Sequence, residues 1–283
     1  MKLHRIILIG LCMLVSSCSQ AEQKEMKAKD LLKVLEKGKS LEIANVIILD
    51  DLDFTTLENE QMLSANQVQV VVPENVFFYN CIFMGKVTTS GTKAISSKEV
   101  QKQMKFEQNF VFQNCDFRGE VNFDNLIVKG QFSLEKSKFR QFASCNNMMI
   151  WSKDTYLSEI EAEQPFNMIY STFLGSVYMS DAIFHEKFAM QESTIQGKFV
   201  ANNLKANKMA SFDMLSVRGR AMFNYAEMKE FALFSEARFH DDAEFIKTDF
   251  GTQSLDTIFK GTHFYGKNMR DEVKGNCCNI KKN

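Results

Sequence analysis

Proline, tryptophan and histidine are scarce in this chain of 283 residues, which has two, one and four of them. Charge is nearly balanced, because 34 Lys and Arg against 35 Asp and Glu leave a formal net charge of −1. A balanced surface lacks the basic footprint of nucleic-acid binding, so we expect no nucleic-acid partner. The histidines and the seven cysteines have no spacing typical of a zinc site, and we expect neither a metal nor another cofactor.

The N-terminus is typical of an export signal. Lys2 and Arg5 precede an apolar run at residues 6–15 that is too short to span a membrane. The residues that follow, 15–18 (VSSC), resemble a bacterial lipobox. This resemblance implies cleavage before Cys18 and lipidation of that cysteine, including palmitate. A plain secretory signal is the alternative.

The lipobox divides the N-terminal region into a signal peptide at residues 1–17 and a solvated, lipidated tether at residues 18–27. The absence of Asp at Ser19 argues, by the same resemblance, against retention in an inner membrane. We therefore expect a protein of the bacterial cell envelope that is lipid-anchored at an outer membrane or cell surface.

An eleven-residue repeat runs through most of the chain. Bulky or apolar residues, here called central residues, are followed by apolar or small residues at plus four and plus six. The clearest central residues are Phe106, Phe117, Val128, Phe139, Phe173, Phe184, Ile195, Ala206, Val217, Met228, Phe239 and Phe250. A short fixed period predicts a solenoid, in which each repeat buries its apolar side against its neighbours.

Each repeat consists of two five-residue pieces and one spacer, and alternation turns the first and third residue of a piece inward. A glycine often follows two residues after the central residue, where we expect a tight bend with positive φ. These glycines are Gly85, Gly119, Gly130, Gly175, Gly197 and Gly219. An eleven-residue period also occurs in right-handed coiled coils, but the Gly, Asn, Ser and Thr between the apolar positions favour short strands.

The pieces resemble those of the pentapeptide-repeat family. The resemblance rests on residues 81–85 (CIFMG), 115–119 (CDFRG) and 171–175 (STFLG) and covers roughly residues 44–264. It implies an all-β fold, a right-handed quadrilateral β-helix with four five-residue sides per coil. The spacer lengthens each coil to about 22 residues. A family match of this kind says little about function.

Elements at both ends complete the predicted domain organisation. Asp30 is expected to cap a helix from Leu31 to Lys37, within an N-terminal cap at residues 28–43 that covers the open end of the β-helix. Residues 265–283 are expected to form a polar C-terminal tail.

Two segments interrupt the repeat. Residues 90–105 are polar and lysine-rich, and if they loop out, Cys81 and Cys115 stack on adjacent coils. There we favour buried free thiols over a disulfide, which parallel inward side chains do not suit. Residues 149–164 contain Trp151 and Tyr156. An ordinary packed loop is the simpler interpretation, but insertions in solenoids often bind, and these two aromatics are candidate contacts.

An outward column is the second candidate contact. With 22 residues per coil, Tyr178, Val200 and Met222 align on three successive coils, whereas the earlier positions that we take as equivalent, Asn122, Ser133 and Ser144, are polar. An apolar column on a polar rod indicates a face for self-association or for a protein partner. Isolated exposed apolar residues are also ordinary surface.

Catalytic signatures are absent. The chain has no Walker or Rossmann glycine loop and no nucleophile elbow. Asp181, Glu192 and Glu236 are scattered rather than clustered across coils. We therefore predict a non-enzymatic envelope lipoprotein, a β-helical binding or scaffold module that mediates protein interactions at a membrane surface. The alternative is a β-helix that binds or cleaves envelope glycan.

Overall fold

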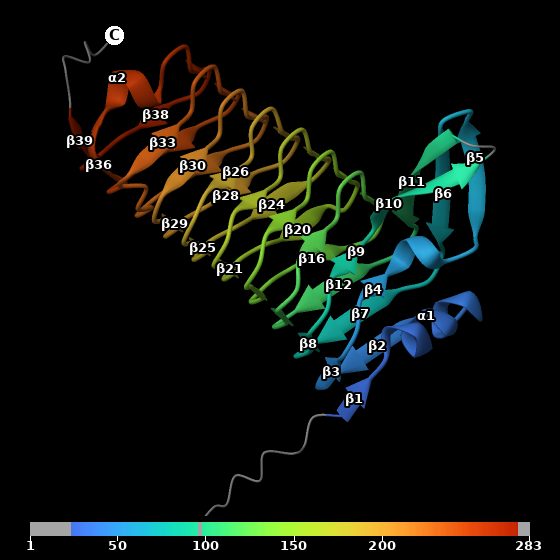
Figure 1. Ribbon diagram of the computed structural model, residues 1–283. Coiled ribbons are helices and arrows are strands. Elements are labelled where there is room, and N and C mark those ends of the chain that lie inside the picture. Colours follow the sequence, from blue (N-terminus) through green and yellow to red (C-terminus); the bar gives the residue numbers. More distant parts are fainter. Residues whose placement is uncertain (1–23, 96–97, 277–283) are drawn as a thin grey trace, which may run out of the picture.

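The structure, a computed structural model, describes residues 24–95 and 98–276. Cys18 and the first part of the predicted tether lie outside the described residues. The fold is almost entirely β, a parallel solenoid with four sheets that form four sides, here sheets A to D (Figure 1). Partner residues on successive coils are about 22 positions apart, as Val177 and Phe199 are, which confirms the predicted coil length.

Sheet A contains eight strands: β1 (Lys24–Met26), β3 (Val46–Ile48), β8 (Ile82–Phe83), β13 (Asp116–Phe117), β17 (Lys138–Phe139), β21 (Glu161–Ala162), β25 (Ile183–Phe184) and β29 (Lys205–Ala206). Sheet B contains ten: β2 (Leu41–Ala44), β7 (Val76–Tyr79), β12 (Phe110–Gln113), β16 (Phe132–Ser133), β20 (Asp154–Tyr156), β24 (Ser176–Tyr178), β28 (Phe199–Val200), β32 (Ala221–Met222), β35 (Ala243–Glu244) and β38 (Asn268–Met269).

Sheet C contains eight strands: β4 (Leu52–Asp53), β9 (Val87–Thr88), β14 (Val121–Asn122), β18 (Ala143–Ser144), β22 (Phe166–Asn167), β26 (Phe188–Ala189), β30 (Met209–Ser211) and β33 (Phe231–Leu233). Sheet D contains β5 (Glu60–Ser64), β6 (Gln67–Val72), β10 (Ser90–Ile95), β11 (Lys98–Phe106), β15 (Ile127–Val128), β19 (Met149–Ile150), β23 (Thr172–Phe173), β27 (Thr194–Ile195), β31 (Ser216–Val217), β34 (Arg238–Phe239) and β37 (His263–Phe264). Beyond β29, isolated bridges at Glu227 continue the line of sheet A to β36 (Asp249–Ser254), which pairs with β39 (Lys274–Asn276).

Phenylalanine rings fill the interior of the rod. Phe83, Phe117 and Phe139 stack on successive coils with centroid distances of 4.9 and 4.8 Å, close to the spacing of paired strands. Phe212, Phe223, Phe234 and Phe245 are fully buried, as the inward positions of the repeat predict. Each ring packs against rings of the coils before and after it, so that one continuous core runs along the rod.

The prediction of positive φ at the repeat glycines was wrong. The six repeat glycines do not have positive φ. A Cβ at Gly119 would lie 2.8 Å from the Lys86 nitrogen and closer still to the Gly85 carbonyl, so close approach of the preceding coil requires glycine there. Positive φ occurs instead at the alternate corners, on residues such as Asn114, Lys136 and Met214.

The prediction of a loop at residues 90–105 was incomplete, because this segment and residues 58–70 are both inserted into neighbouring coils. Strand β6 pairs parallel with β11, while β5 and β10 pair antiparallel with β6 and β11. The resulting four-stranded flap extends sheet D beside the N-terminal half of the rod (Figure 1). The coils that carry these insertions stay in register, so the backbone N–H of Asp116 donates to the Cys81 carbonyl and Cys81 lies beside Cys115 on the next coil. Both cysteines are buried free thiols in the structure.

The prediction that residues 149–164 interrupt the rod was wrong. This segment forms β19, β20 and β21 and continues three sheets without a break. The spacing between inward residues of sheets D and B is four at Val128 and Phe132 but five at Ile150 and Thr155, so one additional residue enlarges this corner. A single inserted residue shifted the repeat by one position, and the sequence analysis therefore interpreted the segment as an interruption. The coil itself pairs with its neighbours as the other coils do.

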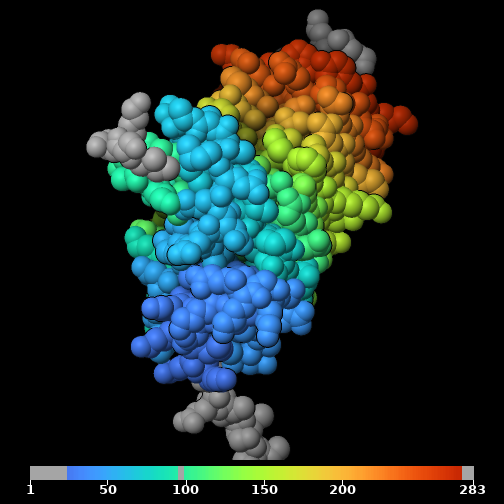
Figure 2. Space-filling model, turned by 90° about the vertical axis from the view of Figure 1, so that its right-hand side faces the viewer, coloured from blue at the N-terminus to red at the C-terminus, as the bar shows by residue number. Residues whose placement is uncertain are grey.

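The ends of the rod also differ from expectation. Helix α1 (Ala28–Glu36) begins three residues earlier than predicted, and Asp30 does not cap it but pairs with Lys33 within the first turn. The helix buries Leu31, Leu32 and Leu35 against the first coil, whose corner carries the 3-10 helix η1 (Phe54–Thr56). Figure 2 views the molecule from this N-terminal end, with the cap region in blue and the flap in cyan and green.

Strands lie where the tether and the C-terminal tail were expected. Strand β1 is part of sheet A, so residues 24–26 belong to the fold rather than to a solvated tether. At the other end, helix α2 (Leu255–Ile258) and strands β38 and β39 extend the solenoid to Asn276, beyond the predicted boundary at residue 264. Arg270 lies over the rings of Phe259 and Phe264 at the last coil.

Candidate binding surface

The enlarged corner between sheets D and B presents Trp151 to solvent. Its side chain is 47% exposed, and Lys129 Nζ on the preceding coil lies 5.5 Å from the ring centroid. The additional residue is accommodated because buried Ser152 folds back, and its Oγ donates to the Asp154 carbonyl at 2.8 Å. This corner is wider than its neighbours, which turn at Gly130 and Gly175.

An open pocket of about 360 Å³ lies at this corner. It is lined by Lys129, Gly130, Gln131, Trp151, Ser152, Lys153, Asp154 and Tyr156. The structure therefore brings together the two aromatic residues that the sequence analysis selected from this segment. Two aromatic side chains and several polar or charged groups line it, a combination that can bind a polar ligand. Below, this feature is called the Trp151 pocket.

Four outward residues of sheet B form an apolar column on successive coils. Backbone pairing places Tyr178 beside Val200 and Val200 beside Met222, which confirms the predicted alignment of these three residues. Tyr156 precedes Tyr178 in the same column, and their rings stack at 5.7 Å with an interplanar angle of 14°. These four residues, here called the sheet B strip, are all partly exposed.

Sequence reasoning missed that Tyr156 belongs to the strip. The signal was available, because Tyr156 lies 22 residues before Tyr178, but the segment was interpreted as an interruption. Two of the polar comparison residues were also misplaced, since Asn122 and Ser144 lie in sheet C. Only Ser133 continues the column, and it is buried.

Further apolar side chains adjoin the Trp151 pocket on sheet D. Met149 is 41% exposed, and Leu174, which follows Trp151 on the next coil, is 47% exposed. With Trp151 they form what is here called the sheet D patch. The patch and the strip meet at the pocket, because Trp151 and Tyr156 both line it. Burial first, and then the nearby carboxylate of Asp154, raise the pKa of Tyr156, so its phenol remains a hydrogen-bond donor at neutral pH.

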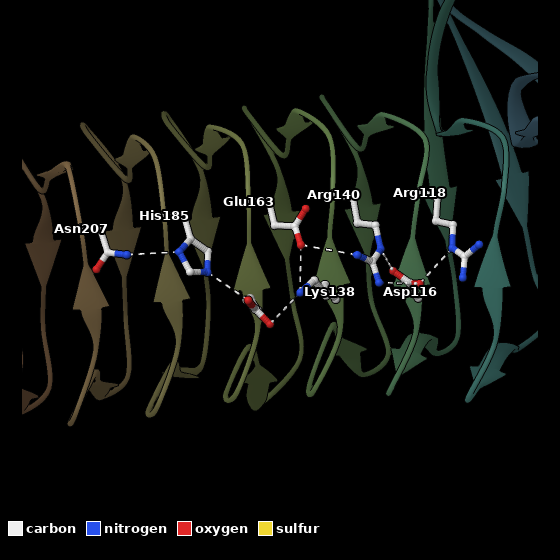
Figure 3. A network of polar contacts seen from close by, with 8 residues as sticks. Asp116, Arg118, Lys138, Arg140, Glu163, His185 and Asn207 are labelled. Carbon is white, nitrogen blue, oxygen red and sulfur yellow. Dashed lines mark hydrogen bonds and ion pairs between the residues drawn. The ribbon is translucent and has the colours of Figure 1, made fainter.

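Sheet A presents a different surface, a network of ion pairs that crosses several coils (Figure 3). Arg140 pairs with Asp116 at 2.7 Å and with Glu163 at 3.5 Å, while Lys138 pairs with Glu163 at 2.9 Å and with Glu161 at 3.1 Å. Opposite charges alternate along the rod and offset one another. This face therefore presents little uncompensated charge to a ligand.

His185 is the one histidine in this network. Its Nδ1 accepts from Asn207 at 3.1 Å, which leaves the proton on Nε2 to donate to Glu161 at 2.9 Å. Both ring nitrogens are thus engaged by side chains of neighbouring coils. His185 joins coils together, and His240 lies beside a different sheet, in a ring stack with Tyr265.

The described residues contain no group of three or more His, Cys, Asp or Glu side chains that could hold a metal ion. Within the same residues, no helix has the length and apolar character needed to cross a membrane. Comparisons of the chain with protein-family models, with curated proteins and with solved structures found no match. The fold and surface define the class as a parallel β-solenoid with an open pocket of aromatic and polar residues where sheets D and B meet.

Proposed function

We propose that the chain is a non-enzymatic binding and scaffold module of the pentapeptide-repeat type, held at a bacterial envelope membrane by lipid on Cys18. The observation that carries the proposal is the meeting of the sheet D patch and the sheet B strip at the Trp151 pocket. Trp and Tyr dominate binding energy at protein interfaces, and contiguous exposed apolar surface marks such sites. The partner is a second envelope protein that contacts the sheet D patch.

The lipid anchor rests on the lipobox-like residues 15–18. Ser19 in place of Asp supports an outer-membrane or cell-surface location. A solenoid suits a scaffold, because its rigid sides present side chains at fixed intervals along one direction. The paired charges of sheet A suit a solvated face that leaves the apolar surface as the site of contact.

Site-specific photocrosslinking in living cells tests the partner. A photoreactive amino acid replaces Leu174 in the sheet D patch or, as a matched control, Met84, which is 43% exposed on another part of the rod. We expect a discrete heterologous adduct from position 174 alone, and its loss when Trp151→Ala is added. Equal labelling from both positions, or an adduct that survives Trp151→Ala, would remove the sheet D patch as the binding site.

A glycan ligand is the second candidate, and the Trp151 pocket favours it. Aromatic rings can pack against the apolar face of a sugar, and here Gln131 and Asp154 stand beside them as hydrogen-bonding groups. Trp151 is the only tryptophan of the chain, so indole fluorescence reports this pocket directly. Saturable quenching by soluble envelope-glycan fragments, absent in a Tyr156→Ala variant, would favour the glycan over the protein partner.

A further inference from the structure

We infer that the sheet B strip pairs with the same strip of a second copy of this chain, in an antiparallel twofold arrangement. The inference refines the proposed contact surface, because it assigns the strip to self-association and leaves the sheet D patch for the other partner. The strip is bounded by buried polar side chains at both ends, Ser133 before Tyr156 and Glu244 after Met222. It is therefore a closed apolar segment that spans four coils.

A twofold axis that lies in the face, perpendicular to the rod and between β24 and β28, matches this segment to itself. It places Tyr178 opposite Val200 of the second copy and Tyr156 opposite Met222. It also places Ser133 opposite Glu244, so polar ends meet polar ends. An isologous interface requires such a self-complementary surface, and adjacent strands about 4.8 Å apart keep the two columns in step.

The residues two positions before each strip residue support this arrangement through charge. In order along the rod they are Asp154, Ser176, Lys198 and Arg220. The twofold reverses that order in the second copy, so Asp154 faces Arg220 and Ser176 faces Lys198. Two Asp154–Arg220 pairs thus form across one interface. Asp154 has no ion pair within the part of the chain that the structure describes. Arg220 pairs with the buried Glu244 within its own chain, and its side chain remains 46% exposed, so it can also contact Asp154 of the second copy.

The residues two positions after each strip residue are small and polar: Ser158, Ser180, Asn202 and Asn224. The same twofold places Ser180 opposite Asn202. Neither the Ser180 hydroxyl nor the Asn202 amide nitrogen makes a hydrogen bond to another described residue, so both can bond across the interface. Small flanks also keep the face flat, which lets two strips approach.

A twofold axis that lies in the face and runs parallel to the rod gives a less favourable arrangement. It places each coil opposite itself, so that Asp154 faces Ser158 and Arg220 faces Asn224, and no opposite charges meet. The antiparallel arrangement has one further consequence. Because Asp154 lines the Trp151 pocket, Arg220 of the second copy adds a cation to the edge of that pocket. The pocket is then completed by a residue of the second copy.

Cysteine crosslinking in intact membranes tests the geometry with the full chain. Two differently tagged copies are expressed together, one with Asp154→Cys and the other with Arg220→Cys. Oxidation should join them into a dimer that carries both tags. The matched control combines Asp154→Cys with Ser158→Cys, which meet only in the parallel arrangement, and chains without an introduced cysteine set the background. A dimer from the 154–158 combination, or none from the 154–220 combination, overturns the inference.

Light scattering on the purified full chain in detergent provides a second readout. The parent should have twice the mass of one chain, and Val200→Lys with Met222→Glu should reduce it to a single chain while the circular dichroism stays unchanged. Met84→Glu, outside the strip, should leave the dimer intact. A parent chain of single mass, or a dimer that survives the double substitution, refutes the pairing. The photocrosslink from position 174 does not depend on these results, so failure of one proposal is distinguishable from failure of the other.

Discussion

At the scale of single residues, the two kinds of corner solve different steric problems. At the repeat glycines, which lie where sheets A and C or sheets D and B meet, the neighbouring coil approaches so closely that an added Cβ would collide with its backbone, as at Gly119. Where sheets B and A or sheets C and D meet, the backbone needs a left-handed residue, but the side chain projects into solvent. Asn, Lys, Glu and Met therefore occupy these corners, as Lys136 and Met214 do, despite their positive φ.

These corners predict opposite effects of glycine and alanine. Gly119→Ala should destabilise the protein by about 1–3 kcal/mol, because the added methyl group overlaps backbone of the neighbouring coil. Met214→Gly should stabilise it by up to about 1 kcal/mol, since relief of the left-handed strain exceeds the entropy cost of glycine. Urea unfolding of both variants measures the difference. If both substitutions changed the free energy of unfolding in the same direction, one steric requirement would govern all corners.

The core predicts a large effect at Phe223. Its ring is fully buried, stacks on Phe245 at 5.1 Å and meets Phe212 and Phe234 edge to face. Phe223→Ala should cost about 3–5 kcal/mol through lost transfer energy and the cavity that remains. Because repeats contact only their neighbours, hydrogen exchange should accelerate first in the adjacent coils. An unchanged unfolding midpoint would contradict the assignment of this ring to the core.

At the scale of elements, the ion pairs of sheet A join coils that are already paired through backbone hydrogen bonds. Burial by itself raises the pKa of Asp116, but hydrogen bonds from Arg140 and Arg118 outweigh it, and the pKa lies below its usual range. His185, followed by Lys138, lowers the pKa of Glu161. Both carboxylates are thus stabilised in their charged form, mainly by side chains of neighbouring coils.

The sign of the pH dependence follows from these pKa values. Unfolded Asp and Glu titrate near pH 4, so below that pH the unfolded chain binds protons that the folded carboxylates still exclude. The contribution of these carboxylates to the free energy of unfolding is complete above about pH 4. It is lost as the pH falls through their folded pKa values. We expect Asp116→Asn to weaken the acid sensitivity seen in urea unfolding. Glu186→Gln, which removes no ion pair in the described part of the chain, should not change it.

At the scale of the whole molecule, the rod has a defined polarity relative to the proposed anchor. Strand β1 and helix α1 lie at one end, and the sheet B strip lies farther along the rod (Figure 1). The proposed lipid on Cys18 would hold the capped end nearest the membrane and would leave the strip and the Trp151 pocket accessible. The position of the contact surface away from the anchored end suits a scaffold.

Substitution of the anchoring residue tests this arrangement. Cys18→Ala should release the protein from the membrane fraction or leave the precursor uncleaved, because acyl chains on the cysteine are the proposed attachment. Radiolabelled palmitate should label the parent chain but not the variant. The control Cys145→Ala, which removes a buried cysteine of the core, should keep both the label and the membrane location. A variant at Cys18 that is processed and bound normally would exclude the lipoprotein proposal.

Local periodicity predicted much of this fold without any tertiary information. The recurrence of Phe at eleven-residue intervals determined the solenoid, the inward rings and the coil of about 22 residues, because stacked coils must repeat the same inward positions. It also aligned Tyr178, Val200 and Met222, since outward residues one coil apart are neighbours.

Only the tertiary structure decided which residues depart from the repeat and what they form together. One additional residue near Ser152 hid the membership of Tyr156 in the strip, because a periodic pattern cannot distinguish an enlarged corner from a loop. Two inserted segments became a single flap only by pairing with each other, a contact between residues distant in sequence. The same limit applied to the glycines: their spacing marked the corners, but the distance to the preceding coil explains why they must be glycine.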